Sequence, residues 1–506
     1  MLQTEPSTRR IARNTLMLYL RTLLSVVVGL YTSRVVLYTL GVEDYGIYGL
    51  VGGIVSMLGF LNASLAGATS RFITYDLGVG DFEKLKQTFN TAFQSHLLIA
   101  FIIVLISETI GLWFVNYQLD IPQERYFAAN CIYQLSILSA VIGITQAPYT
   151  AVVLAHEQMD VYAWLEILNV VLKLIIVWLL QLTSNDRLIF YGLLVFVVTI
   201  LIRSIYRFFC HRHYPESHLC LVWNPTILRK MLSFTGWNLY ADASVSVRQQ
   251  GINILINRFF GVALNASCGL ASMIQGIFWT LGYNVVAAFR PQIIKQYASG
   301  DFIRMMHLMG QALKITLILL CLFSIPVFIE MPFLLQLWLN DVPAYTVVFC
   351  RILLLDNLLG IVNFIINLGV YAQGDIKKMS IASGTYKFLC LPVIFLLFHF
   401  AFTPAWAYWC NLICLVVIVA TDFYFLKVQV PQIDVKYIFE VFVKSFSLII
   451  FATIGYIYLH SIFPDTLFCK FICFLLFVLI LFLLAYYFLL DKAEKRSLIL
   501  FIHLRR

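Results

Sequence analysis

The sequence is poor in charged residues, and this scarcity excludes a large soluble protein. Aspartate, glutamate, lysine and arginine make up 12% of its 506 residues, whereas apolar residues make up 61%. A typical soluble domain carries about 25% charged residues. With half that share, the chain could not cover the exterior of a globule of this size with polar groups. We therefore expect an integral membrane protein, for which lipid is the solvent.

Motifs of several enzyme classes are also missing. The sequence contains no Gly-x-x-x-x-Gly-Lys-Ser/Thr phosphate-binding loop and no His-Glu-x-x-His metalloprotease helix. No polar segment is long enough to form a soluble catalytic domain. We expect a protein that is not an enzyme and that uses no cofactor.

The eleven cysteines show no spacing typical of a disulfide framework. Most lie in apolar runs, where a free cysteine behaves as a small apolar residue. The exception is a polar loop that contains Cys210, His211, His213, His218 and Cys220. A zinc site in this loop is an alternative to a basic loop that contacts lipid headgroups. Its spacing matches no standard zinc pattern, so we expect no metal.

Long apolar runs separated by short polar segments predict an all-α protein with about fourteen transmembrane helices. A helix needs about 20 residues to cross the hydrocarbon core. The runs that meet this length cover residues 15–39, 45–68, 91–115, 127–154, 163–183, 188–210, 235–258, 266–289, 311–333, 346–371, 380–400, 405–426, 442–462 and 467–490.

Lysine and arginine predict the orientation of these helices. If the N-terminus lies in the cytoplasm, only Arg125, Arg187, Arg258 and Lys470 fall on the outer side. Many more, Arg203 and Lys387 among them, then fall on the cytoplasmic side. The positive-inside rule therefore places both termini in the cytoplasm. The net charge of +9 reflects this bias, so we expect no nucleic-acid partner.

Short motifs recur at an offset of 220 residues. Gly41-Val42 matches Gly261-Val262, and Gly80-Asp81-Phe82 matches Gly300-Asp301-Phe302. A weaker similarity links the segments 155–157 and 372–375. Because the repeat spans an even number of helices, the two halves are expected to be parallel.

This repeat predicts three parts of the chain. We expect an N-terminal six-helix lobe over residues 1–212 and a C-terminal six-helix lobe over residues 213–430. Two additional transmembrane helices and a cytoplasmic tail occupy residues 431–506. Two such lobes around a central cavity would suit transport by alternating access.

Ionisable residues inside membrane spans are costly and usually functional. Arginine suits bidentate contact with phosphate. We predict a substrate site in the cavity from the basic residues of these spans and from the polar face of span 235–258. Its candidate members are Arg21, Arg34, Arg248, Asn238, Gln249, Arg71 and Arg290.

Structural roles remain open for several of these residues. Arg34 could extend its charge to the membrane surface, and Arg71 and Arg290 could anchor helix ends to lipid headgroups. Asp242 and Asp356 are the acids expected to couple transport to a proton or a sodium ion. The alternatives for them are ion pairs with Arg248 and Arg351.

Two segments carry a resemblance to a known superfamily. The stretch Thr39-Leu40-Gly41-Val42-Glu43-Asp44-Tyr45-Gly46-Ile47-Tyr48 is similar to the pattern LG-x-x-x-(Y/F)-G-x-(Y/W). Asn62-Ala63-Ser64-Leu65 and Ala68-Thr69-Ser70-Arg71 resemble the end of the following helix. Together with the two repeats, they resemble the bacterial polysaccharide branch (Wzx-type) of the multidrug/oligosaccharidyl-lipid/polysaccharide (MOP) exporter superfamily.

This resemblance implies a flippase for undecaprenyl-diphosphate-linked oligosaccharide in the bacterial inner (plasma) membrane. Such proteins serve O-antigen, capsule or exopolysaccharide biosynthesis. The partners implied are the lipid-linked oligosaccharide and the bilayer, with glycan polymerase machinery as an open possibility, and we expect a monomer.

Two alternatives remain at this stage. A cation-coupled multidrug exporter of the same superfamily is the first, although the first span carries arginines where drug exporters typically carry acids. A membrane-embedded glycan polymerase or ligase is the second. It would need a large outer loop, and the outer loops here are short.

Overall fold

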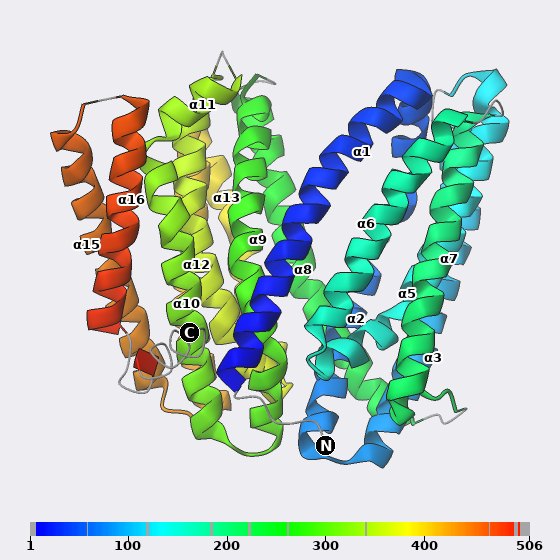
Figure 1. The fold of residues 1–506 in the computed structure, drawn as a ribbon, viewed down its shortest axis with the longest axis horizontal. Coiled ribbons are helices and arrows are strands. Elements are labelled where there is room, and N and C mark those ends of the chain that lie inside the picture. The colour runs from blue at the N-terminus through cyan, green and yellow to red at the C-terminus, as the bar shows by residue number, and fades with distance from the viewer. Residues whose placement is uncertain are drawn as a thin grey trace, which may run out of the picture. The chain divides into compact units, whose positions relative to one another are not determined.

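The protein is all-helical in its described part, as predicted. The computed structural model describes residues 7–57, 59–117, 121–182, 186–220, 224–260, 263–339, 342–464, 466–489 and 494–495. These residues contain α-helices with short 3₁₀ and π segments and no strand (Figure 1). Contacts between Cα atoms divide the chain into two compact units. Unit 1 is Met1–Leu239 with Tyr297–Ser299, and unit 2 is Tyr240–Gln296 with Gly300–Arg506.

The elements of unit 1 follow one another with short connections. They are α1 (Ser7–Met57), α2 (Gly59–Val79), α3 (Phe82–Ile106), η1 (Ser107–Gly111), α4 (Leu112–Tyr117), η2 (Gln123–Arg125), α5 (Tyr126–Ala155), α6 (Met159–Leu182), α7 (Arg187–His213), η3 (Pro215–Ser217) and the start of α8 (Pro225–Phe260). Helix α5 packs against α2, α3 and α7, and α6 packs against α1 and α7.

Unit 2 contains the rest of α8 and the remaining helices. They are α9 (Ala263–Ala298), α10 (Phe302–Ile329), α11 (Met331–Leu339), α12 (Thr346–Gln373), α13 (Lys377–His399), α14 (Ala405–Gln429), α15 (Val435–Ile462), α16 (Leu467–Leu484) and η4 (Ala485–Leu489). Helix α12 is the most buried of these and packs against α10 and α14.

Eleven helical segments of the described chain are long and apolar enough to cross a membrane. The three predicted spans outside this set, residues 15–39, 45–68 and 235–258, lie on α1, α2 and α8. Helix α8 carries Asp242, Arg248 and Arg258, and these charges lower its apolar character. The count of about fourteen spans is therefore compatible with the structure.

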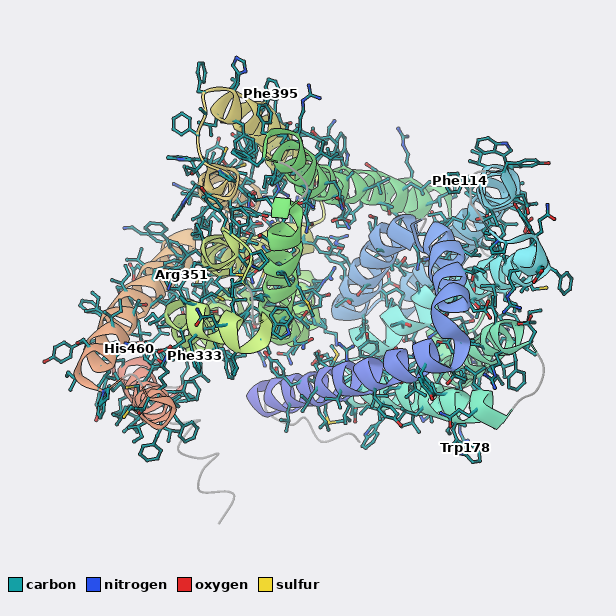
Figure 2. The ribbon with its side chains drawn as sticks, turned by 90° about the horizontal axis from the view of Figure 1, so that it is seen from above. Phe114, Trp178, Phe333, Arg351, Phe395 and His460 are labelled. Carbon is teal, nitrogen blue, oxygen red and sulfur yellow. The ribbon has the colours of Figure 1, made fainter. Side chains whose placement is uncertain are left out.

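Large apolar side chains point outward from the helices of each unit. Phe114 and Trp178 of unit 1 and Phe395 of unit 2 are 40%, 62% and 44% exposed (Figure 2). Many similar residues share this exposure. A soluble monomer rarely exposes so much contiguous apolar surface, whereas a bilayer accommodates it. The fold is therefore that of a multi-pass integral membrane protein.

A glycine interrupts the long helix α1. Gly41 has φ 83° and ψ 168°, which breaks the helical path between residues 7–40 and 42–57. This positive φ is readily adopted only by glycine. The motif therefore lies between two helical segments, 7–40 and 42–57, in agreement with the predicted boundary between two spans. Its repeat partner Gly261 lies outside the described residues.

The two halves of the repeat use the same capping geometry. Gly80 and Gly300 adopt φ 80° and 78°, and each directly precedes an aspartate. The Asp81 carboxylate accepts a 3.0 Å bond from the backbone N–H of Lys84, and the Asp301 carboxylate accepts a 3.0 Å bond from that of Arg304. Helices α3 and α10 thus begin in the same way, as an aspartate N-cap predicts.

The weaker repeat has a structural counterpart too. Glu157, after α5, has φ 60°, and Gly374, after α12, has φ 98°. Each ends its helix in the left-handed conformation, which commonly terminates helices. Glutamate rarely adopts this conformation, so its presence here points to constraint from the surrounding fold.

The two C-terminal helices, α15 and α16, are linked to α10 by packing and by ion pairs within unit 2. Helix α15 packs along α10, and α16 packs on α15. Glu330, just after α10, lies 2.6 Å from His460 of α15 and 2.8 Å from Lys470 of α16. At another point of α10, the buried Lys314 lies 3.0 Å from Glu494. These ion pairs bind the added helices to the lobe that precedes them.

Candidate functional site

Arg21 lies on α1 and faces an aromatic ring of α6. Its guanidinium carbon is 5.1 Å from the centroid of the Tyr162 ring. A cation over a ring face gains roughly 0.5–1 kcal/mol at an exposed site. Arg21 forms no ion pair with any other described residue. The side chain of Arg34, the second candidate on this helix, lies outside the described part.

Arg71, near the end of α2, is 5% exposed and surrounded by aromatic rings. Its guanidinium carbon lies 4.7 Å from the Phe72 ring, 5.0 Å from the Tyr75 ring and 5.8 Å from the Phe234 ring. This environment holds the side chain inside unit 1. Arg71 is therefore more buried than a flexible headgroup anchor would need to be.

Arg290 of α9 has a similar aromatic environment in unit 2. Its guanidinium carbon is 4.7 Å from the Tyr371 ring of α12. The Nε of Arg290 is buried, and no described residue accepts a hydrogen bond from it. Both halves of the repeat therefore hold an arginine against aromatic rings.

The polar face of α8 remains accessible in the structure. Asp242 and Gln249 are exposed, and Asn238 and Arg248 are half-buried. The Nε of Arg248 is buried without an acceptor among the described residues. This helix therefore presents a row of accessible or half-buried polar groups.

Asp356 of α12 lies at the centre of an amide cluster and is 9% exposed. The Asn411 amide donates to its Oδ1 at 2.7 Å, and the Gln275 amide donates to its Oδ2 at 3.1 Å. The next residue, Asn357, donates to the backbone carbonyl of Gln275 at 2.9 Å. Three helices, α9, α12 and α14, thus meet at this carboxylate.

Asp356 does not form the ion pair with Arg351 that the sequence left open. Arg351 instead donates to the backbone carbonyls of Phe328 and Ile329, at 2.8 and 3.2 Å. These carbonyls lie near the end of α10, where unpaired acceptors attract cations. Arg351 therefore has a structural role at that helix end.

A second buried acid, Asp422 of α14, escaped the sequence analysis. It is fully buried and accepts a 2.5 Å bond from the Asn363 amide. The Asn367 amide in turn donates to Asn363 at 3.3 Å. Asn363 and Asn367 lie on α12 like Asp356, but the acid that Asn363 contacts is Asp422. In the sequence, Asp422 is an acid near the end of the apolar run 405–426, and this position was the signal that could have identified it.

Lys387 lies near the middle of α13, whereas the charge count treated it as a cytoplasmic residue. Its charge interacts with those of Arg248, Asp422 and Asp242. Asp356 also interacts electrostatically with Arg248. Unit 2 therefore contains a mixed group of two cations and three acids, which the sequence recognised only in part.

The polar loop that contained a possible zinc site has other contacts. The Cys210 thiol donates to the Tyr149 carbonyl, and His218 contacts the His211 carbonyl at 3.0 Å. The rings of His211 and His218 stack at 4.0 Å. No group of three or more potential ligands that could hold a metal ion occurs in the described part of the chain.

Taken chemically, the candidate residues divide into two kinds. Arg21, Arg248 and Arg290 offer guanidinium N–H groups that form no salt bridge with a described carboxylate, although Arg248 interacts electrostatically with Asp356. Asp356 and Asp422 are buried acids solvated by amides. The first kind can bind an anion, and the second can bind or release a cation or a proton.

Solved structures of membrane transporters have the same fold. A MATE protein in the bent conformation matches with a TM-score of 0.72 at 16% identity, over 86% of this chain and 97% of that one. An outward-facing multidrug resistance MATE family transporter of the MOP superfamily matches with a TM-score of 0.70 at 14% identity, over 85% and 97%.

A third match carries a description of its pocket. It is a MOP superfamily transporter from Pyrococcus furiosus Vc1 (DSM3638). For that protein, a reverse polarity of the binding pocket is described as suggesting a different function. It has a TM-score of 0.69 at 13% identity, over 84% of this chain and 96% of that one. No protein-family model and no curated protein matches the chain. The chain therefore has a MATE-like fold, and the structural matches extend no further than the fold.

Proposed function

We propose that this protein is a flippase that moves undecaprenyl-diphosphate-linked oligosaccharide across the inner membrane by alternating access. Its product would serve O-antigen, capsule or exopolysaccharide biosynthesis. The MATE-like fold supports a membrane exporter, and the resemblance of segments 39–48 and 62–71 to the polysaccharide branch supports the substrate class.

The observation that carries this proposal is the set of arginines without carboxylate partners. Arg21, Arg248 and Arg290 lie on helices of the transmembrane bundle, and none forms an ion pair with another described residue. Leaving a charge unpaired in a low-dielectric interior costs several kcal/mol. A diphosphate would supply the missing negative charge and suits the bidentate geometry of guanidinium groups.

Asp356 and Asp242 are proposed to couple this movement to a proton or cation. Asp356 is the better placed of the two, because amides from α9 and α14 hold both of its oxygens. Protonation would remove the acceptor for one of these bonds and so loosen the contact between the helices. Asp242 is exposed on α8 and would act from the accessible face.

A deletion strain tests the proposed function directly. It should lose its surface polysaccharide and accumulate undecaprenyl-linked repeat units inside the cell. Expression of the wild-type chain should restore the surface polysaccharide. A deletion strain with normal surface glycan would contradict the proposal.

A cation-coupled multidrug exporter is the second candidate. The observation in its favour is the pair of buried acids in unit 2, since Asp356 and Asp422 could attract a cationic substrate. Efflux of a cationic dye that requires Asp356 and Asp422 would support this function. If efflux is absent while glycan export is intact, the exporter function is excluded.

A further inference from the structure

Unit 1 contains a partly open pocket whose lining does not include Arg21, Arg248 or Arg290. Its volume is about 620 Å³, within the range of pockets that hold small organic ligands. Helices α1, α2, α3, α5 and α7 all contribute to its wall. Apolar side chains such as Ile103, Ile132, Leu135, Ile144 and Val195 form most of the lining.

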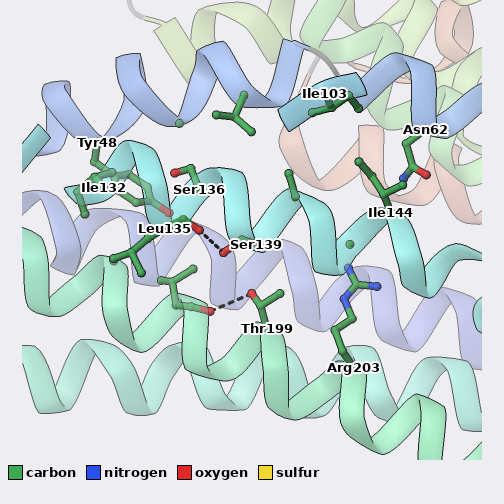
Figure 3. A pocket seen from close by; sticks show the side chains of 16 residues that line it. Tyr48, Asn62, Ile103, Ile132, Leu135, Ser136, Ser139, Ile144, Thr199 and Arg203 are labelled. Atoms are coloured by element: carbon green, nitrogen blue, oxygen red, sulfur yellow. Dashed lines mark hydrogen bonds between the residues drawn. The ribbon is translucent and has the colours of Figure 1, made fainter. Parts of the chain in front are cut away.

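The pocket is a slot along two parallel helices. A Cβ at Gly192 of α7 would collide with the side chain of Ile132 of α5, and one at Gly143 of α5 would lie 3.3 Å from the Nη2 of Arg203 of α7. The two helices are therefore aligned over the stretch from Ile132 to Gly143. At 1.5 Å per residue, this stretch is about 16 Å long. Figure 3 shows Tyr48 and Ile132 at one end of the slot, and Asn62 and Arg203 at the other.

Arg203 is the charged residue at the polar end of the slot. It lies well inside α7, ten residues before His213, and is half-buried. Gly143 has no side chain, and this leaves space for the guanidinium group of Arg203. Arg203 has no hydrogen bond or ion pair with another described residue. Glu166 interacts with it electrostatically but does not form a salt bridge with it in the described part of the chain.

Two hydroxyl groups in the middle of the slot already donate to backbone carbonyls. Ser139 and Thr199 donate their hydroxyl protons to the carbonyls of Leu135 and Val195, at 2.8 and 2.9 Å. Their hydroxyls can therefore only accept further bonds and would not hold an anion. At the polar end, the Oδ1 of Asn62 is buried without a partner among the described residues. The assignment of amide oxygen and nitrogen is interchangeable, so this group can also donate to an anion beside Arg203.

From this arrangement we propose that unit 1 binds a small amphiphilic anion, with its phosphate or carboxylate group at Arg203 and its apolar body along the slot. The site is separate from the residues assigned to the lipid-linked oligosaccharide. An anionic head at Arg203 relieves the unpaired guanidinium charge, and the apolar wall buries a single alkyl chain. The positive charge of Arg203 would repel a cationic head group and would stay unpaired.

Two probes that differ only in head group test this site. Binding of dodecyl phosphate and of dodecyltrimethylammonium is measured on the full chain in lipid nanodiscs. We expect the wild type to prefer dodecyl phosphate by about tenfold, equivalent to about 1.4 kcal/mol. Arg203→Gln should abolish this preference. Arg207→Gln, a change at an exposed arginine one turn further along α7, should keep it.

Two further variants separate this pocket from folding defects and from other basic positions. Ala140→Phe keeps Arg203 but fills the slot, so it should weaken binding of dodecyl phosphate. Arg229→Gln should leave the preference intact, because Arg229 is exposed and does not line the pocket. Equal binding of the two probes by the wild type, or an undiminished preference in Arg203→Gln, would overturn the proposal.

Native mass spectrometry of protein purified without a probe identifies the source of the ligand. A bound single-chain anion in the wild type but not in Arg203→Gln would indicate a membrane lipid. An empty wild type that still binds dodecyl phosphate with the expected preference would indicate a water-soluble amphiphile. The failure of the deletion-strain experiment would leave this binding result unaffected.

Discussion

Single arginines of the membrane helices differ in what they contact. Arg351 donates to backbone carbonyls, Arg71 is enclosed by aromatic rings, and Arg21 faces one ring without an ion pair to any described residue. A guanidinium that already serves the fold has little capacity left for a substrate. Arg21 is therefore the residue for which a functional role is easiest to test.

Substitution of Arg21 by alanine should abolish glycan export while the protein stays in the membrane. Loss of a charge-assisted contact of about 1.5–3 kcal/mol corresponds to a decrease of roughly tenfold to a hundredfold. Arg21→Lys should restore export only in part, because lysine lacks the bidentate fork. Surface polysaccharide staining measures the effect, with the exposed Arg229→Ala as control. Full export by Arg21→Ala would remove this residue from the site.

A second residue-scale prediction concerns a pair outside the membrane spans. Glu216 of η3 is 6% exposed and lies 2.6 Å from the Nε2 of His156. Burial would raise the pKa of Glu216, but the hydrogen bond and the charge of His156 outweigh it and lower the pKa below the usual 4.5. A lowered carboxyl pKa stabilises the fold at neutral pH, and this stabilisation is lost as the pH falls through the folded-state value.

The Glu216→Gln variant should therefore be less stable than the wild type at pH 7, and the difference should shrink as the pH falls below about 4.5. Thermal unfolding at several pH values measures this effect. Glu124→Gln, at an exposed position of η2, serves as the control. A constant difference between Glu216→Gln and wild type across this range would contradict the assignment.

Among the helices, the repeat is clearest where α3 and α10 begin. Gly80-Asp81 and Gly300-Asp301 have nearly the same backbone angles and the same 3.0 Å capping bonds. Because the two caps have the same geometry and both aspartates are exposed, we expect the two capping bonds to contribute equally to the free energy of unfolding. The two caps can therefore be compared within one protein.

Asp81→Ala and Asp301→Ala should each destabilise the protein by about 1 kcal/mol, the usual value for an N-cap. Asparagine at either position should retain most of this stability, because its side-chain oxygen also accepts the capping bond. Thermal unfolding of the two alanine variants and the two asparagine variants measures the effect. A large loss at one cap and none at the other would show that the caps differ in energy despite their geometry.

For the whole molecule, the basic residues that are expected on the outer side make contacts within the fold. Of the four basic residues expected there, Arg125 pairs with Asp44 and Asp186, and Lys470 pairs with Glu330. Arg187 donates to the carbonyl of Thr39 at 3.2 Å. Basic residues on this side thus serve contacts within the fold.

Reporter fusions test the predicted orientation. Alkaline phosphatase joined after Phe402, between α13 and α14, should be active because this segment is expected outside. The same enzyme joined after Ile433, between α14 and α15, should be inactive because this segment is expected in the cytoplasm. The reverse pattern of activity would invert the orientation.

Much of the fold could be predicted from the sequence. Apolar runs of about 20 residues gave the transmembrane helices, because a span must satisfy its backbone hydrogen bonds within itself. The clearest omission concerns a charge inside a run, because Asp422 of α14 was missed. Lys387 and Arg203, which the charge count assigns to the cytoplasmic side, lie well inside α13 and α7.

The sequence by itself determined the solvent of this protein, its helices and the repeated Gly-Asp caps, because these depend on local composition and on neighbours three or four residues away. Only the tertiary structure decided which amides hold Asp356, that Asn363 serves Asp422, and that Gly143 admits Arg203 to a pocket. These partners lie about 55 to 80 residues apart in the chain, and helix packing alone brings them within hydrogen-bond or van der Waals distance.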